Sequence, residues 1–278
     1  MSEANWRQCA EYEVKEVSVG MHNVFVYQMC ELSLDAMFAM LSEMDTEQTE
    51  ISGTRIWTGS LALSHYLLTH ADILRGTCTL ELGAGTGMCS IVAKKLGAGM
   101  CIATDGDDQV VQILKENVRL NEESVHAHIL SWGDAKSHNQ LLAQFPGLKS
   151  NSTLILAADV LYKAMLIPLL LDSVTKIFDD ASGAKQSHLF LLCHVPRAQV
   201  SHDMVENALK ASRFEYSVQS IRDIHDINLE EMLKLEECPK EEYLQTKIYR
   251  ITAISGDSVD SGVLFSGTKE YFSSPCTR

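Results

Sequence analysis

Short apolar runs alternate with amphipathic stretches along most of this 278-residue chain. The amphipathic stretches repeat hydrophobic residues at the three- and four-residue spacing of a helix. This alternation predicts βαβ units, in which helices cover a mainly parallel sheet, and therefore an α/β fold. Strands are expected at 77–82, 100–104, 126–132, 153–158, 188–193, 214–220 and 246–253, which makes seven. Helices are expected at 59–69, 88–96, 107–120, 164–178 and 199–212.

The pattern changes before the first of these helices. Residues 11–19 and 22–29 are two β-rich segments around Gly20, which predicts a hairpin outside the main sheet. Residues 32–44 have helical spacing, and a polar stretch through Gly53 follows them. The N-terminal part is therefore expected to be an extension built from a hairpin and a helix.

The end of the chain is also distinct. An acidic insertion at 223–242 precedes the last strand, and the residues after it are rich in Ser and Gly. Such a tail is expected to be poorly ordered. We expect an N-terminal extension at 1–55, one α/β domain at 56–254 and a flexible tail at 255–278.

Composition narrows the classes of partner and location. Hydrophobic residues make up 46% of the chain, which is ample for a core, and the formal charge is −14. A charge of this sign disfavours binding to a phosphate backbone and would attract a basic partner, although a solvated acidic surface explains it equally well. Eight cysteines without a C-x-x-C pair indicate a reducing compartment. The longest apolar stretch, 154–171, is interrupted by Asp159, Lys163 and Pro168, so we expect no membrane span and a soluble, cytoplasmic or nuclear protein.

The strongest local signal is LELGAGTG at 80–87, which joins a predicted strand directly to a predicted helix. Its glycines, Gly83, Gly85 and Gly87, let the backbone turn sharply and approach a ligand, and the helix that follows presents free N–H groups. Dinucleotide sites use G-x-G-x-x-G, whereas the spacing here is G-x-G-x-G with Glu81 just ahead. An acidic residue there suits an amino-acid moiety with an ammonium group better than a phosphate. A purely structural tight turn is the alternative.

Two further positions suit a nucleoside. Asp105 ends the second predicted strand, where a carboxylate can accept both ribose hydroxyl hydrogens. Asp107 and Asp108 are better explained as the start of the next helix. Trp132, in SWGD, could line an adenine pocket or belong to the core, and Trp57, in TRIWTGS, carries the same two interpretations.

The fourth strand ends in LAADVLY, which places Asp159 and Tyr162 three residues apart at the carboxyl edge of the sheet. A carboxylate beside an aromatic ring can hold a cationic or partly desolvated amine. The alternative is that Asp159 caps the helix that follows it. The ten histidines lack an H-E-x-x-H motif, so no metal site is expected.

With these motifs in order, the region from Trp57 to Ala253 resembles the eukaryotic seven-strand protein methyltransferases of methyltransferase family 16. The resemblance rests on Trp57, LELGAGTG, Asp105, SWGD and ADVLY, and it is weak at both termini. It implies a Rossmann-like seven-strand class I methyltransferase fold, with the N-terminal extension as an addition. It also implies S-adenosylmethionine as cofactor and transfer of a methyl group to a lysine of a protein. The expected cofactor contacts are Trp57, Glu81, Gly83, Ala84, Gly85, Gly87, Asp105, Trp132 and Ala158.

The family's D-x-x-Y signature matches Asp159 and Tyr162, which are expected to orient the acceptor amine and to line its channel. The partner is expected to be a basic or lysine-presenting protein, and the enzyme a monomer. Small-molecule or other N-methylation, and a silent scaffold that binds S-adenosylmethionine, remain alternatives. A nucleic-acid N-methyltransferase is disfavoured, because ADVLY replaces the usual [DN]-P-P-[YFW] loop. The acidic insertion at 223–242 is longer than in compact family members, and it is either a substrate-selecting element or a tolerated loop.

Overall fold

The computed structural model describes residues 10–32, 52–180, 188–197, 199–212, 214–224 and 240–254. Its centre is a seven-stranded sheet with the order β5-β4-β3-β6-β7-β9-β8. The five strands from β5 to β7 pair in parallel, whereas β9 pairs antiparallel with both β7 and β8. The strands are β3 (Cys78–Leu82), β4 (Cys101–Asp105), β5 (Val125–Ile129), β6 (Thr153–Ala158), β7 (Leu189–His194), β8 (Phe214–Ser220) and β9 (Lys247–Ala253). The predicted seven strands and the α/β class are confirmed.

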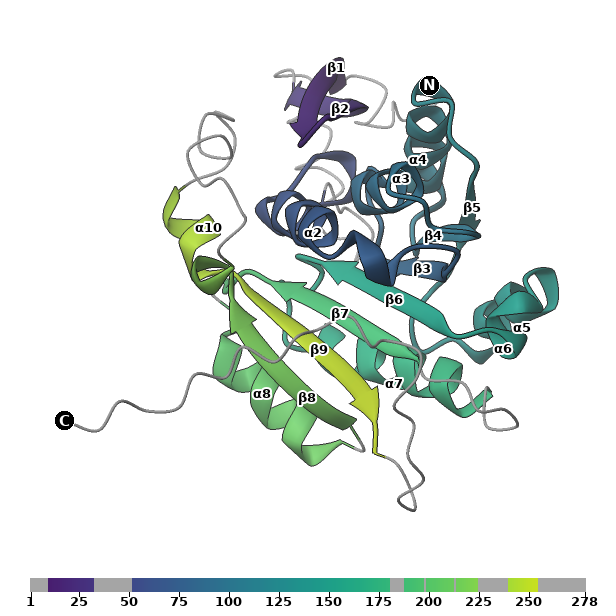
Figure 1. The fold of residues 1–278 in the computed structure, drawn as a ribbon, viewed down its shortest axis with the longest axis vertical. Coiled ribbons are helices and arrows are strands. Elements are labelled where there is room, and N and C mark those ends of the chain that lie inside the picture. Colours follow the sequence, from purple (N-terminus) through teal and green to yellow (C-terminus); the bar gives the residue numbers. More distant parts are fainter. Residues whose placement is uncertain are drawn as a thin grey trace, which may run out of the picture.

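Helices cover both faces of the sheet (Figure 1). One layer holds α2 (Thr58–Thr69), α3 (Met88–Lys95) and α4 (Asp108–Leu120). The other holds α5 (Ala135–Gln144), α6 (Gly147–Ser150), α7 (Leu166–Asp180) and α8 (His202–Ala211). Each layer encloses a hydrophobic core: the first core lies between the sheet and α2, α3 and α4, and the second lies between the sheet and α5 to α8. Because successive strand residues point to opposite faces, Leu154 and Leu156 of β6 belong to the first core, whereas Ile155 and Ala157 belong to the second. All six residues of β6 are buried, as expected for a central parallel strand.

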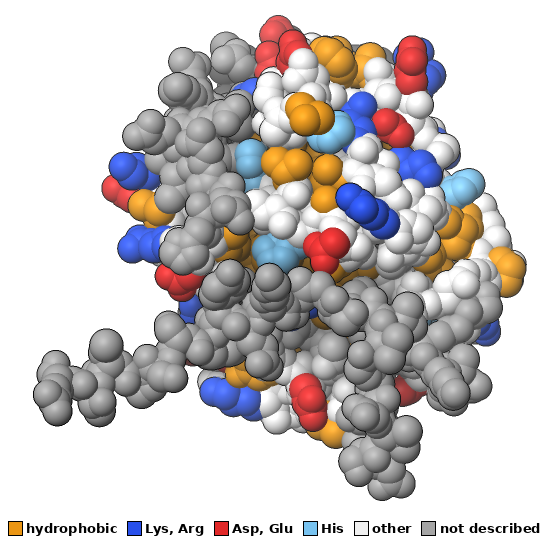
Figure 2. Space-filling model, in the orientation of Figure 1, with side chains coloured by type: hydrophobic (Ala, Val, Ile, Leu, Met, Phe, Trp, Pro, Cys, Tyr) orange, Lys and Arg blue, Asp and Glu red, His pale blue; other side chains and the backbone are white. Residues whose placement is uncertain are grey.

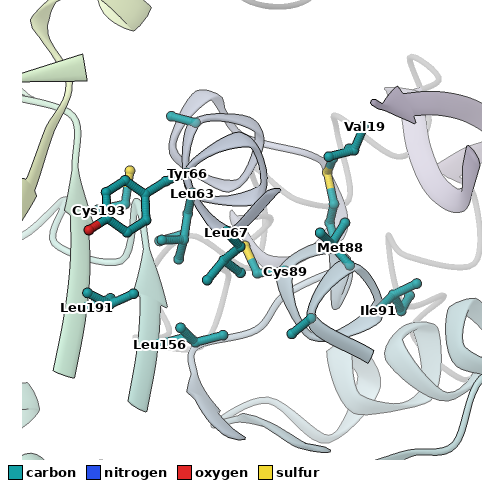
Figure 3. Packing of buried hydrophobic residues seen from close by; sticks show 14 of the residues in the cluster. Val19, Leu63, Tyr66, Leu67, Met88, Cys89, Ile91, Leu156, Leu191 and Cys193 are labelled. Atoms are coloured by element: carbon teal, nitrogen blue, oxygen red, sulfur yellow. The ribbon is translucent and has the colours of Figure 1, made fainter. Parts of the chain in front are cut away.

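Helix α2 lies beside α3 in this layer and packs on β6 and β7 (Figure 3). Leu63, Tyr66 and Leu67 of this helix are at most 1% exposed and belong to the first core, together with Leu191 and Cys193 of β7. This packing fixes the N-terminus of α2 against the carboxyl edge of the sheet, where the candidate site lies.

Some elements differ from the predictions. Helices α5 and α6 were not predicted, because few apolar residues mark them, although Asp134 caps α5 through the amides of Lys136 and Ser137. A further short helix, α10 (Lys240–Gln245), ends the predicted acidic insertion. Short 3-10 turns, η2 (Ser52–Thr54), η3 (Ala71–Ile73) and η4 (Ile221–Asp223), complete the described elements.

The predicted N-terminal hairpin is present as β1 (Ala10–Val19) and β2 (His22–Leu32), which pair only with each other in a separate two-stranded sheet. The predicted helix at 32–44 is wrong at its first residue, since Leu32 ends β2, and its other residues lie outside the described ranges. Residues 225–239 of the acidic insertion and the tail from 255 also lie outside them.

Two asparagines of α4 hold the hairpin against the domain. Asn117 Oδ1 accepts a hydrogen bond of 2.6 Å from the Tyr27 amide, and its Nδ2 donates to the Tyr27 carbonyl at 3.1 Å. Asn121 makes the same pair of bonds with the backbone of Phe25, at 2.9 and 2.6 Å. These side chains, four residues apart on one helix face, satisfy alternate backbone groups of β2. The hairpin is thereby joined to the helix that follows β4.

Candidate functional site

The glycine loop lies at the carboxyl ends of the parallel strands, where β3 turns into α3. Gly83, Gly85 and Gly87 all have positive φ, of 69°, 54° and 81°. A Cβ atom on Gly83 would lie 2.8 Å from Val160 Cγ1 and 3.1 Å from Trp132 Cζ2. The loop therefore needs glycine both for its conformation and for the close approach of its neighbours. Neighbouring Ala84, also predicted as a contact, anchors the loop to β4 by donating its amide hydrogen to the Thr104 carbonyl at 2.8 Å.

Asp105 ends β4 and faces this loop. Its Oδ2 accepts a 3.0 Å hydrogen bond from the Gly85 amide, and its Oδ1 accepts one of 3.2 Å from the Asp107 amide. Burial raises the pKa of the Asp105 carboxyl, which those backbone bonds counteract. Asp107 caps α4 through the Gln109 amide at 2.8 Å, and Asp108 lies in its first turn, as predicted.

Glu81 points away from solvent, into the core beneath α3. Glu81 is only 2% exposed, and its Oε2 accepts hydrogen bonds from the amide and the hydroxyl of Ser90, at 2.9 and 2.5 Å. Burial raises the pKa of Glu81 to about 7. Its described contacts hold β3 to α3, and its predicted role toward an ammonium group stays a prediction.

The two predicted tryptophans come from different parts of the fold. Trp57 is 39% exposed at the N-cap of α2, and its indole N–H donates to the Ser52 carbonyl. Trp132 lies beyond the end of β5 rather than in the strand, because the strand stops at Ile129. It is half-buried, contacts the second core and lies beside Gly83, and its role in an adenine pocket stays a prediction.

Asp159 directly follows Ala158, the buried last residue of β6, and has a positive φ of 56°. Its side chain is 3% exposed. Arg197 donates to both carboxylate oxygens, from Nε to Oδ1 at 3.2 Å and from Nη2 to Oδ2 at 2.5 Å. The amide of Gly59 also donates to Oδ2, at 3.4 Å. Asp159 therefore lies at the N-terminus of α2, not of the helix that follows it in sequence. Burial raises the pKa of the Asp159 carboxyl, and the bonds from Arg197 oppose that rise.

Arg197 is a site residue that the sequence did not reveal. It follows β7 in the run HVPRAQ, and no spacing or motif distinguishes it there. Besides Asp159, it contacts Glu242 of α10, with Nη1 donating to Oε2 at 2.9 Å. Its guanidinium carbon lies 5.5 Å from the centre of the Trp57 ring, within the range of a cation–π contact.

Tyr162 lies close to the turn that precedes α2. Its Oη accepts a 3.5 Å hydrogen bond from Ser52 Oγ, and the Lys163 ammonium lies 5.5 Å from the centre of its ring. A Cβ atom on Gly85 would lie 3.3 Å from the Gly53 carbonyl oxygen. The η2 turn thus lies between the glycine loop and the D-x-x-Y motif, and contacts both.

The residues at this edge fit S-adenosylmethionine. The three positive-φ glycines carry no side chains, so the backbone at these positions can approach a bulky ligand closely. Asp105 has further acceptor capacity on each carboxylate oxygen for the ribose hydroxyls. Trp132, beside Gly83, supplies aromatic surface on which an adenine could stack.

Two other features are absent from the described ranges. No group of three or more His, Cys, Asp or Glu there could hold a metal ion. Within those ranges, no helix has both the length and the apolar character needed to cross a bilayer.

Comparisons with known proteins agree with this geometry. A solved structure from Streptococcus mutans, classed among the S-adenosylmethionine-dependent methyltransferases, aligns with a TM-score of 0.50 at 12% identity, over 87% of this chain and 56% of that one. This similarity concerns the fold alone.

Proteins with similar sequences give more specific information than the shared fold does. The chain is 31% identical over 137 residues to protein-lysine N-methyltransferase EFM3 of Chaetomium thermophilum, covering 48% of this chain and 40% of that protein. It is 38% identical over 124 residues to protein-lysine methyltransferase METTL21E of Mus musculus, with coverage of 42% and 48%. It is 33% identical over 156 residues to protein N-lysine methyltransferase METTL21A of Xenopus tropicalis, covering 54% of this chain and 64% of that protein. The matches span less than two thirds of each relative's length.

The family comparison covers more of the chain. The model described as lysine methyltransferase, methyltransferase family 16, matches residues 40–210, which is more than half of the sequence. The matched region includes the glycine loop, Asp105, the D-x-x-Y motif and Arg197. Family, fold and site geometry agree, and the cofactor that they share is S-adenosylmethionine. The chain belongs to the lysine methyltransferases of family 16.

Proposed function

We propose that this chain transfers a methyl group from S-adenosylmethionine to a lysine side chain of another protein. The observation that carries the proposal is the contact between two motifs. Val160 of the D-x-x-Y turn packs so closely on Gly83 that a Cβ atom there would lie 2.8 Å from its Cγ1. The turn with Asp159 and Tyr162 therefore adjoins the loop that fits the cofactor. The names of the three relatives support lysine as the acceptor.

The chemistry asks the protein mainly for alignment. When bound, S-adenosylmethionine supplies a methyl group that its sulfonium has already activated. A lysine amine, with an ordinary pKa of about 10.4, must be neutral before it can attack, and a partly desolvated site favours the neutral form. Holding the amine in line can contribute about 7 to 11 kcal/mol. The glycine loop and Asp105 would hold the donor, and the D-x-x-Y turn would hold the amine.

Asp159 suits the role of an orienting group rather than a strong base. Its carboxylate is paired with Arg197 through both oxygens, so much of its negative charge is compensated. A remaining lone pair can still accept a hydrogen bond from the amine. Tyr162, which reaches the η2 turn, would form the wall of the acceptor channel.

The acceptor would be a protein with an accessible lysine, in a basic segment that the net charge of −14 attracts. On the face in Figure 2, the described residues intersperse positive and negative side chains, so those in view form no single acidic patch. Buried free thiols at Cys78, Cys89, Cys101 and Cys193 suit a reducing compartment. We further propose a monomeric enzyme of the cytoplasm or nucleus that acts on protein and not on nucleic acid.

Labelling tests the proposal. The purified chain is incubated with radiolabelled S-adenosylmethionine and a lysate of cells that lack it. Asp159→Asn runs in parallel, and Asp172→Asn, which changes an exposed aspartate on α7, serves as the matched control. We expect a nuclease-resistant protein band with the wild type and with the control, and none with Asp159→Asn. Label confined to small molecules or nucleic acid would contradict the proposal, and the absence of label despite cofactor binding would favour a scaffold.

A further inference from the structure

Three charged side chains form a bridge across the candidate acceptor site. Arg197 lies at its centre and donates to Asp159 on one side and to Glu242 on the other. Its side chain is 21% exposed, whereas those of Asp159 and Glu242 are 3% and 38% exposed. The bridge, here called the Arg197 bridge, therefore runs from the buried end of β6 to the surface.

The outer end of the bridge belongs to α10. Glu242 Oε2 accepts a second hydrogen bond, of 3.2 Å, from the hydroxyl of Thr58, the first residue of α2. Tyr243, next to it, is fully buried in the first core. Helix α10 is thus fixed against α2, and it lies outside residues 40–210, the region that matches the family. A segment beyond the shared region consequently contacts the shared site.

The geometry of Arg197 suits it to fix a carboxylate. A guanidinium that bonds both oxygens sets the plane of the carboxyl group as well as its position, which a lysine ammonium cannot do. The third nitrogen of Arg197 bonds Glu242, so the orientation of the guanidinium is itself fixed. Since Asp159 has left-handed backbone dihedrals, it depends on its surroundings to hold its conformation.

We propose that Arg197 is a positioning residue for methyl transfer, which holds the Asp159 carboxylate toward the acceptor amine, and that Glu242 makes this position depend on α10. This inference rests on the function proposed above. It assigns to the C-terminal part of the chain a share in the acceptor site.

Kinetics of four variants test the inference, with the acceptor protein purified after the wild type has labelled it. A displacement of about 1 Å at a reacting group can cost on the order of 100-fold in rate, so we expect Arg197→Met to lower kcat by about that factor. Arg197→Lys keeps the charge but loses the fork, and should recover no more than about a tenth of the wild-type kcat. Glu242→Gln should lower kcat by about 3- to 10-fold, as expected for one lost charge-assisted bond of a partly exposed pair. Its neighbour Glu241 is exposed, and Glu241→Gln is the matched control, expected to leave kcat unchanged.

Two further readouts separate positioning from stability. The affinity for S-adenosylhomocysteine, measured by calorimetry, should be unchanged in all four variants, as should the acceptor KM. A role in stability alone would lower the urea midpoint of Arg197→Met while the folded enzyme kept its kcat, and that result would overturn the inference. Full rescue by Arg197→Lys would overturn it too.

Carboxyl carbon NMR of Asp159 provides a test without catalysis. The charged groups that act on it are Arg197 after β7 and Glu242 on α10, while β7 also presents the thiol of Cys193 and α2 presents the Gly59 amide. Arg197→Met should raise the pKa of Asp159, whereas Glu242→Gln should lower it. An unchanged titration in both variants would show that the bridge does not form in solution. If the wild type methylates no protein, the proposed function fails; if it methylates and Arg197→Met does so equally well, only this inference fails.

Discussion

Asp105 stabilises the glycine loop, and we predict that the same carboxylate binds the cofactor. It accepts hydrogen bonds from the Gly85 and Asp107 amides and lies at the carboxyl edge of β4. We predict that Asp105→Asn weakens S-adenosylhomocysteine binding by about 10- to 100-fold, because a hydrogen bond to a charged group contributes roughly 1.5 to 3 kcal/mol. Calorimetry would measure this change. Asp108→Asn, an exposed neighbour on α4, is the control, and equal affinities in the two variants would contradict the assignment.

Glu81 makes stability depend on pH. Its pKa is about 7 in the folded protein because of burial, against 4.5 as the ordinary value. Between these two pH values the folded state holds a proton that the unfolded state releases, so stability falls as pH rises through this window. The slope from this one group is about 1.4 kcal/mol per pH unit.

Glu81→Gln removes this ionisation. The unfolding free energy of the variant minus that of the wild type should therefore rise from pH 4.5 to 7 and then stay constant. Urea denaturation at several pH values measures it. A difference that does not change with pH would mean that Glu81 titrates normally in the folded protein.

At the level of residues, sequence reasoning found the motifs but not all of their partners. Asp105 and Asp159 stand out because each ends an apolar strand, and the structure places both at the same edge of the sheet. Arg197 gives no such signal, because its role arises from contacts with residues 38 and 45 positions away. The burial of Glu81 against Ser90 likewise depends on tertiary packing, which a strand-and-loop pattern does not reveal.

At the level of elements, strands were the easiest to predict. The central strands of the sheet are buried apolar runs, and β6 and β8 match their predicted bounds in full. The predicted strand at 126–132 extended too far, because Leu130 is apolar and buried although it lies outside the strand. Helices α5 and α10 were missed because polar residues dominate both, and their few apolar side chains carry little periodicity.

The hairpin offers a test at this level. Asn117 bonds both backbone groups of Tyr27 and also the Thr86 carbonyl, at 2.9 Å, so it joins β2 to the glycine loop region. Asn117→Ala leaves the partly buried Tyr27 groups and the buried Thr86 carbonyl without this partner, which should cost roughly 1 to 3 kcal/mol of unfolding free energy. Hydrogen exchange at the Tyr27 amide should become at least about tenfold faster. Gln112→Ala, at an exposed position of α4, is the control, and unchanged exchange at Tyr27 in Asn117→Ala would show that the hairpin is held elsewhere.

For the whole molecule, two buried histidines contribute to the pH dependence of stability below about pH 6.5. Burial lowers the pKa of His194 to about 3 and that of His65 to about 4, below the ordinary 6.5. The unfolded chain therefore binds protons that the folded chain excludes, and stability falls as pH drops below about 6.5. Each group contributes a slope of about 1.4 kcal/mol per pH unit until its folded pKa is reached.

We predict that His194→Gln reduces the slope of unfolding free energy against pH, between pH 6.5 and 4, by about 1.4 kcal/mol per pH unit. Urea midpoints at several pH values, followed by circular dichroism, would measure the slope. An equal slope in variant and wild type would show that His194 does not contribute.

The proposed methylation of a protein lysine depends on the whole molecule, since the glycine loop, the D-x-x-Y turn and α10 all meet at one edge of the sheet. The most direct measurement is tandem mass spectrometry of the acceptor protein after reaction with S-adenosylmethionine. We predict that the added methyl groups lie on a lysine side chain, and that they are absent after reaction with Asp159→Asn. Methyl groups on another residue type, or an equal yield from wild type and Asp159→Asn, would contradict it.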